Sequence, residues 1–181
     1  MKRLLILALS LALVLSLAAC GGSGDGSKSS GNTNQTASNA PTAKANSKYV
    51  PSYKGCDLPM NADFAPLLDF LGEPDSYFEA ASCAFDGLDK TYTYSGLEIV
   101  TYPDGDKDYV SSVRILDSSV STPEGVTIGS TQEEVAAACG ADFQEIGKQY
   151  VYADGDAELS VLFEDGKAIS VEYVAINDLL G

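Results

Sequence analysis

The chain has 181 residues, enough for one ordinary domain together with processing segments. It contains 26 acidic and 11 basic residues, has a formal net charge of -15, and contains no histidine and no tryptophan. An acidic chain repels nucleic acid, and the lack of histidine removes both the usual activating base of a nucleophile and the commonest transition-metal ligand. We therefore expect no nucleic-acid partner, no cofactor and no enzymatic activity.

The first nineteen residues have the pattern of a secretion signal. Two basic residues precede an apolar run over Leu4–Leu17, which is shorter than the roughly 20 residues that a membrane span needs. The run ends in Leu17-Ala-Ala-Cys-Gly21, which resembles the lipobox of bacterial lipoproteins. The resemblance implies cleavage after residue 19 and acylation of Cys20, which would hold the mature chain on the extracytoplasmic face of the cell membrane. An ordinary signal peptide with an incidental cysteine is the alternative.

Residues 20–48 differ in composition from everything that follows. Gly21–Ser47 has no aromatic and no large aliphatic residue, so it buries too little apolar surface to offset the entropy of ordering. We predict a flexible tether here, with a reach of roughly 30 Å, and a folded domain over 49–181. The signal and the tether each carry a charge of +2, which leaves the domain with -19. That charge suits a basic partner, weak cation binding, or solubility alone.

The first apolar pattern of the domain predicts a helix within Asn61–Leu71. The apolar residues that share one helical face are Phe64, Leu67, Leu68 and Leu71. Asn61 or Asp63 is placed to cap the start, and Gly72 is placed to end the helix. The pattern thus indicates a short helix that buries one side.

A second helix is predicted over Thr131–Cys139. Ser130 and Glu133 have the spacing of a capping box, and Gly140 follows at the position that ends a helix. Val135 and Cys139 share one face, so we expect Cys139 to be buried.

The remaining apolar residues alternate with polar ones, as in strands that bury one face. Six strands are predicted: Thr91–Tyr94, Leu97–Tyr102, Tyr109–Leu116, Gln149–Tyr152, Glu158–Phe163 and Ala168–Ala175. The pair Asp165-Gly166 is a strong hairpin signal. Between the first helix and the first strand, Glu73–Lys90 is expected to form an inserted loop.

Helix and strands recur in the same order. Each half has a short helix that ends in glycine, a Tyr-x-Tyr strand, an acidic turn and a valine-rich final strand. We therefore predict two helix-plus-meander repeats, at about 57–118 and 124–176. The expected fold is α+β, with the repeats forming one antiparallel sheet and the helices on one face.

One stretch carries a resemblance to a known group. Gly125-Val-Thr-Ile-Gly-Ser-Thr-Gln-Glu-Glu-Val135, followed by Cys139-Gly140, resembles the Gly-x-Thr-x-x-Glu-Val…Gly helix motif of the SmpA/OmlA and β-lactamase-inhibitory-protein-like lipoproteins. Three segments of the first half are similar to uncharacterised lipoproteins of Firmicutes: Leu71–Pro74, Ser82–Lys90 and Thr101–Pro103. The resemblance implies tandem helix-plus-meander units and a protein-interaction fold. It does not imply β-lactamase inhibition, because that inhibitor's contact loops have no match here.

Four tyrosines on predicted strands form the candidate binding face: Tyr92, Tyr94, Tyr150 and Tyr152. Exposed tyrosines on a sheet give rigid contact area with a polar tip, which suits protein binding. The partner would be another envelope protein or a wall component. The alternative is that about half of the strand tyrosines, which also include Tyr102 and Tyr109, fill the core and the others are scattered.

An acidic turn offers a second candidate site. Asp104, Asp106 and Asp108 have the 1-3-5 spacing of a calcium loop, but Tyr109 and Ile115 stand where that loop needs glycine and glutamate. A hairpin turn is therefore favoured over a weak cation site, and no metal site is assigned. A receptor that binds a cation or small ligand through such turns is the alternative function.

The remaining reactive groups are cysteines and lysines. Cys56 and Cys83 flank the first helix in a compartment that permits disulfides, so they are a candidate pair, with two free thiols as the alternative. A third function, a hydrolase without histidine, would use Lys90 or Lys148 beside a serine or carboxylate. It requires a pocket that encloses such a pair.

Overall fold

The computed structural model describes residues 40–177. The predicted signal peptide, Cys20 and most of the predicted tether lie outside this range. The helices are α1 (Ala65–Leu71) and α2 (Gln132–Cys139). The strands are β1 (Ser52–Tyr53), β2 (Cys56–Asp57), β3 (Ser76–Ala81), β4 (Leu88–Tyr94), β5 (Leu97–Asp104), β6 (Lys107–Ile115), β7 (Gln144–Ile146), β8 (Gln149–Asp154), β9 (Ala157–Glu164) and β10 (Lys167–Ala175).

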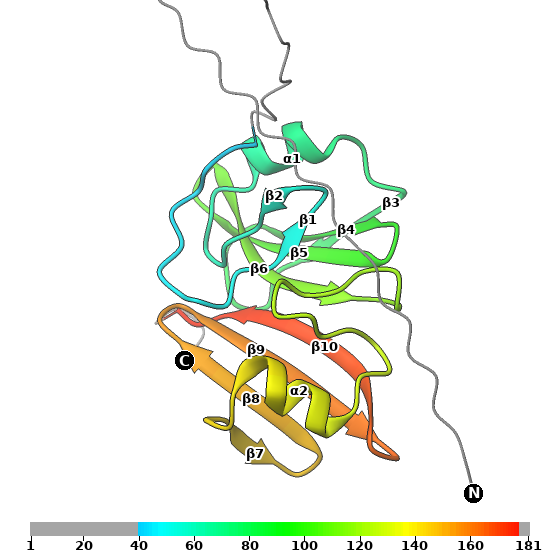
Figure 1. The fold of residues 1–181 in the computed structure, drawn as a ribbon. Coiled ribbons are helices and arrows are strands. Elements are labelled where there is room, and N and C mark those ends of the chain that lie inside the picture. The colour runs from blue at the N-terminus through cyan, green and yellow to red at the C-terminus, as the bar shows by residue number, and fades with distance from the viewer. Residues whose placement is uncertain (1–39, 178–181) are drawn as a thin grey trace, which may run out of the picture. The chain divides into compact units, whose positions relative to one another are not determined.

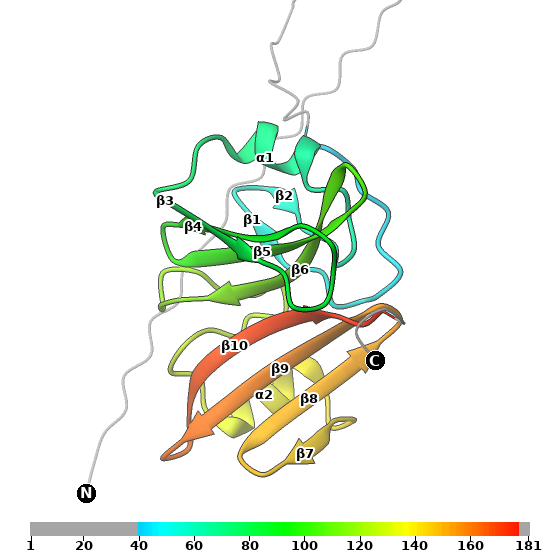
Figure 2. The ribbon, with the colours of Figure 1, turned by 180° about the vertical axis from the view of Figure 1, so that it is seen from behind.

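Eight of these strands form one antiparallel sheet in the order β3-β4-β5-β6-β10-β9-β8-β7. The order consists of two four-strand meanders, which we call the first meander (β3–β6) and the second meander (β7–β10). They are joined where β6 pairs with β10, with Val113 opposite Tyr173. Both views of the ribbon show the two meanders one above the other, with β6 and β10 at the join (Figure 1, Figure 2). The short strands β1 and β2 pair only with each other.

The predicted α+β class is wrong, because the fold is mostly antiparallel sheet: of the residues that the structure describes, 45% are in strands and 11% in helices. The two helices have only seven and eight residues, too few to form a layer over an eight-strand sheet. Figure 1 shows α2 in front of the second meander, whereas α1 lies at the far end of the first. The prediction of a helical layer was therefore wrong because the two helices are too short to cover the sheet.

Helix α1 ends where the pattern indicated but starts later than predicted, at Ala65, with Phe64 and not Asn61 or Asp63 in the N-cap position. The Asp63 carboxylate accepts a hydrogen bond from the backbone N–H of Ala65 at 3.2 Å. At the other end Gly72 has φ +76°, a conformation that favours glycine, and its N–H donates to the carbonyl of Leu68 at 2.9 Å. Leu67 and Leu71 are buried as predicted.

Helix α2 has a capping box one residue later than expected, made by Thr131 and Glu134. The Thr131 hydroxyl accepts from the Glu134 N–H at 3.1 Å, and the Glu134 carboxylate accepts from the Thr131 N–H at 2.7 Å. Ser130 is unavailable because its hydroxyl accepts from the Thr127 N–H and its carbonyl accepts from the N–H of Ala168 on β10. Tertiary pairing thus decides between two caps that the sequence allows equally.

All six predicted strands are present, and their ends differ from the prediction by at most three residues. The hairpin at Asp165-Gly166 is confirmed, since both residues have the positive φ of a tight β9–β10 turn. The predicted inserted loop, in contrast, contains β3 and the first residues of β4.

One cluster of buried side chains runs through both meanders. The segment between Tyr49 and Phe64 contributes Leu58, Met60 and Phe64 to this cluster. Within residues 40–177, no helix is both long enough and apolar enough to cross a membrane.

The last residues of the predicted tether contact the second meander. The backbone N–H of Lys48 donates to the Asp154 carboxylate at 2.7 Å, and the Asn46 amide donates to the Asp156 carboxylate at 3.0 Å. The ring of Tyr49 lies 6.0 Å from that of Tyr152. The acidic β8–β9 turn therefore holds the chain just before the domain begins.

Candidate binding site

Three of the four tyrosines predicted to form a binding face are buried. Tyr92, Tyr94 and Tyr152 are 6%, 3% and 1% exposed, respectively, and all belong to the core. Tyr150 is half-buried and stacks on Phe143, with ring centroids 4.0 Å apart. Tyr94 and Tyr152 therefore fill the interior of the domain, and the four residues do not form a shared surface.

The acidic turn at Asp104–Asp108 is the β5–β6 hairpin, in which Asp104 lies opposite Lys107. The Asp108 carboxylate accepts a hydrogen bond from Lys90 Nζ at 2.6 Å, so this carboxylate is engaged with a side chain of β4. In residues 40–177 no three His, Cys, Asp or Glu side chains are grouped as a metal ion would require. The hairpin prediction is confirmed.

The two lysines considered for hydrolysis are not placed as bases. The hydrogen bond to Asp108 raises the pKa of Lys90 above its ordinary value, so this amine is protonated at neutral pH. Lys148 lies exposed between β7 and β8. A lysine base needs a lowered pKa and an enclosed site, and neither lysine has both.

Cys56, Cys83 and Cys139 are free thiols in the structure. Cys56 is buried and Cys83 is exposed, so the candidate Cys56–Cys83 disulfide is not present. Cys139 is half-buried. Burial raises the pKa of Cys56, and burial together with the nearby Glu124 carboxylate raises the pKa of Cys139 to about 11.

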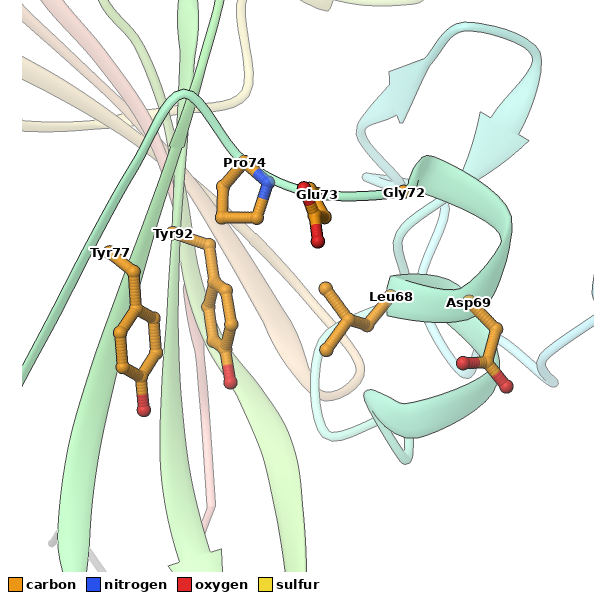
Figure 3. Close-up of a pocket in the computed structure, with 7 residues that line it drawn as sticks. All are labelled: Leu68, Asp69, Gly72, Glu73, Pro74, Tyr77 and Tyr92. Atoms are coloured by element: carbon orange, nitrogen blue, oxygen red, sulfur yellow. The ribbon is translucent and has the colours of Figure 1, made fainter.

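A pocket of about 520 Å³ opens between α1 and the strands β3 and β4. Such a volume is typical of small-ligand sites. Figure 3 shows the residues that line it: Leu68, Asp69, Gly72, Glu73, Pro74, Tyr77 and Tyr92. We call it the α1–β3 pocket.

Two tyrosines form the sheet wall of this pocket. Tyr77 on β3 lies directly opposite Tyr92 on β4, and their ring centroids are 5.1 Å apart. Their hydroxyls point the same way, and Tyr92 lies between Tyr77 and Leu68 in this view (Figure 3). Tyr92 is supported from the core by Phe64, whose ring centroid lies 4.7 Å away. Tyr77 is 48% exposed and can contact a ligand.

The opposite wall is held in place by hydrogen bonds to the sheet. The hydroxyl of Tyr94 donates to the carbonyl of Gly72 at 3.0 Å, and the N–H of Asp75 donates to the carbonyl of Thr93 at 2.8 Å. Glu73 and Pro74 lie between these two anchors. The turn that leaves α1 is therefore fixed against β4, and the pocket is preformed.

The α1–β3 pocket is anionic and aromatic. Asp69 and Glu73 are among its lining residues, and no basic side chain of the described chain lines it. From Gly55 to Asp89 the sequence has eight carboxylates and no lysine or arginine. An electron-rich ring beside carboxylates attracts a cation, so the pocket suits an amine or a guanidinium group.

The tyrosine hydroxyls of the pocket stay neutral. The pKa of Tyr77 is raised, chiefly because its hydroxyl donates a hydrogen bond to the Glu79 carboxylate. The pKa of Tyr92 is raised chiefly by burial. Neither phenol is a nucleophile at neutral pH, so the arrangement is suited to binding.

Sequence reasoning missed most of this pocket because β3 was expected to be a loop. Ser76–Ala81 has no alternation, since both of its faces are exposed. The signal that was present is the adjacent pair Tyr77-Phe78 between Pro74-Asp75 and Ser82, which is aromatic enrichment bounded by turn residues.

Comparison with known proteins identifies no family: no family model and no curated protein matches the chain. Similar solved structures include the following two. A cysteine-rich secretory protein from Staphylococcus aureus has a TM-score of 0.43 and 13% identity, covering 64% of this chain and 44% of that one. A DUF4309 family protein from Bacillus subtilis has a TM-score of 0.39 and 19% identity, covering 65% and 82%, respectively.

The chain thus spans less than half the length of the staphylococcal protein. Both TM-scores are below 0.5, so neither likeness supports a conclusion about this chain. The resemblance to the SmpA/OmlA group stays a prediction.

Proposed function

We propose that the protein is an extracytoplasmic lipoprotein that binds a cationic group of another envelope molecule in the α1–β3 pocket. One observation carries the proposal: two tyrosine rings and two carboxylates line a preformed pocket to which residues 40–177 contribute no basic side chain. The charge of -19 on residues 49–181 extends the attraction beyond the pocket itself.

The location rests on the sequence. The lipobox-like Leu17-Ala-Ala-Cys-Gly21 and the tether after it support an anchor at Cys20. Membrane fractionation of wild-type and Cys20→Ser chains tests it. We expect the wild type to sediment with membranes and the variant to be released or to remain unprocessed. A mature Cys20→Ser chain that partitions as the wild type does would refute the anchor.

Binding is tested with a small probe that carries only the cationic group. N-acetyl-lysine methylamide is titrated into the full chain in detergent, and the tyrosine signals are followed by NMR. We expect saturable binding with a Kd of about 1 mM or weaker, because one amine makes few contacts. N-acetyl-glutamate is the probe of opposite charge and should not bind.

Two variants test whether the probe binds in the α1–β3 pocket. Glu73→Gln keeps the size of the side chain and removes one charge, so the affinity for the amine should fall several-fold. Glu164→Gln removes an exposed charge beside the β9–β10 turn of the second meander and is the matched control. Equal affinities of the two variants would show that overall charge, and not this pocket, attracts the amine.

A further inference from the structure

Strand β3 is an edge of the sheet that is open on both faces. It pairs with β4 on one side and has no strand on the other within residues 40–177. All six of its residues are exposed, including Tyr77 at 48% and Phe78 at 65%. Figure 1 shows β3 at the outer margin of the first meander. The opposite edge strand, β7, has only three residues.

The backbone of β3 has hydrogen-bonding groups that face away from the sheet. The N–H of Ser82 donates to the carbonyl of Gly87 at 3.0 Å, so this pair is a hydrogen-bonded pair of the ladder. Antiparallel pairs alternate between bonded and non-bonded. Given the β3–β4 register, the N–H and C=O groups of Tyr77, Glu79 and Ala81 therefore point outward.

Soluble proteins usually protect such an edge with lysine, proline, a bulge or a very short strand. Residues 76–81 contain none of these, and Glu79 is their only charge. A six-residue edge with two adjacent aromatic side chains is instead suited to accept another strand.

The negative charge around β3 determines which kind of partner strand this edge would attract. The segment from Gly55 to Asp89 contains eight carboxylates and no basic residue. The neighbouring lysines are already paired, Lys90 with Asp108 and Lys107 with Asp63, both at 2.6 Å. A second copy of this chain would bring the same negative charge to the edge and be repelled.

We propose that the outer edge of β3 binds an extended, basic polypeptide segment of a partner protein as an added strand. The proposal rests on the proposed function, because it places a basic side chain of that segment in the α1–β3 pocket. Tyr77 and Glu79 share one face of β3. Residues of the partner opposite them would have side chains on the same face, so lysine or arginine at every second position would meet both groups.

The experiment uses the full chain in detergent and a fluorescent nine-residue peptide of alternating lysine and valine, followed by anisotropy. A second peptide has three of the valines replaced by proline, which keeps the charge and removes strand-forming N–H groups. We expect the first peptide to bind the wild type about tenfold more tightly than the second.

The decisive variant is Glu79→Pro. In the wild type, the backbone N–H of Glu79 faces away from β4. Proline at this position therefore breaks no hydrogen bond to β4 and is tolerated in the edge strand, but it cannot donate a hydrogen bond to an added strand. Glu79→Gln removes the same charge and keeps the N–H. We expect Glu79→Pro to bind the lysine–valine peptide about tenfold more weakly than Glu79→Gln, while circular dichroism and thermal unfolding show that both variants are folded.

The outcomes separate the two proposals. Equal affinities of Glu79→Pro and Glu79→Gln, or equal binding of the two peptides, overturn strand addition. If Glu73→Gln still weakens binding of the small amine in that case, the pocket function stands. A wild-type dimer that Glu79→Pro dissociates would show a second copy on the edge and would also overturn this proposal.

Discussion

The buried tyrosine hydroxyls of Tyr152 and Tyr173 differ in whether they have a hydrogen-bond partner. Tyr173 donates to the Glu124 carboxylate at 2.6 Å, whereas the hydroxyl of Tyr152 is buried without a partner in the described structure. An unpaired buried polar group costs free energy, and a paired one contributes a net stabilisation. The two residues thus allow one chemical change to be tested in two environments.

We predict that removing the hydroxyl has different effects on stability at these two sites. Tyr173→Phe removes a hydrogen bond to a charged group and should lower the free energy of unfolding by about 2 kcal/mol. Tyr152→Phe removes only an unpaired hydroxyl and should leave the stability unchanged or raise it by about 1 kcal/mol. Urea denaturation measures both variants against the wild type. A large loss in Tyr152→Phe would reveal a partner for its hydroxyl.

The three described cysteines should differ in reactivity. Cys83 is exposed, Cys56 is buried, and the pKa of Cys139 is raised to about 11, chiefly by burial. Because the thiolate is the reactive form, we predict that iodoacetamide at pH 8 labels Cys83 first in the folded chain. Labelling of Cys139 should accelerate only as the pH approaches 11. Mass mapping after timed quenching gives the order, and urea-unfolded protein, in which all three react together, is the control.

At the scale of elements, the capping box of α2 makes a prediction that depends on pH. The Thr131 backbone N–H holds the pKa of the Glu134 carboxyl below its usual range. A lowered pKa means that this stabilisation is present above the pKa of the unfolded chain and is lost as the pH falls through the pKa of the folded chain. The cap should therefore weaken in acid.

The matched variant is Glu134→Gln, because glutamine also completes a capping box but does not titrate. We expect the melting temperature of the wild type to fall more steeply than that of Glu134→Gln as the pH is lowered from 7 to 3. Thr131→Ala should destabilise by about 1 kcal/mol at pH 7, and Ser130→Ala should not affect the cap. Parallel melting curves for the wild type and Glu134→Gln would contradict this assignment.

The same elements show what the sequence can predict. Strands with one buried face, such as β5 and β9, alternate clearly and were found. Strand β3 exposes both faces, so no periodicity marks it, and the pocket that depends on it was missed. Tyr92 and Tyr94 alternate with Thr91 and Thr93. This pattern could have indicated that they are the buried face of β4 and not a binding surface.

At the scale of the whole molecule, the two meanders share one core and one row of charges. Buried residues of both meanders belong to a single cluster. On the outer face Arg114 of β6 lies opposite Glu98 of β5 and Glu172 of β10. Its guanidinium donates to Glu98 at 3.2 Å and to Glu172 at 3.1 Å. The arginine therefore bridges three neighbouring strands across the join between the meanders.

We predict that reversing this charge destabilises the entire domain without dividing it. Arg114→Met keeps the aliphatic length and should cost about 1 kcal/mol, because ion pairs that are partly exposed contribute little. Arg114→Glu places three carboxylates in one row and should cost about 2 kcal/mol, lowering the melting temperature by several degrees. Since 1 M salt screens exposed charges, the difference in stability between the two variants should be smaller in 1 M salt.

Because the meanders share a core, far-ultraviolet dichroism and tyrosine absorbance should report one coincident unfolding transition in each variant. Two separate transitions would show that the meanders unfold independently.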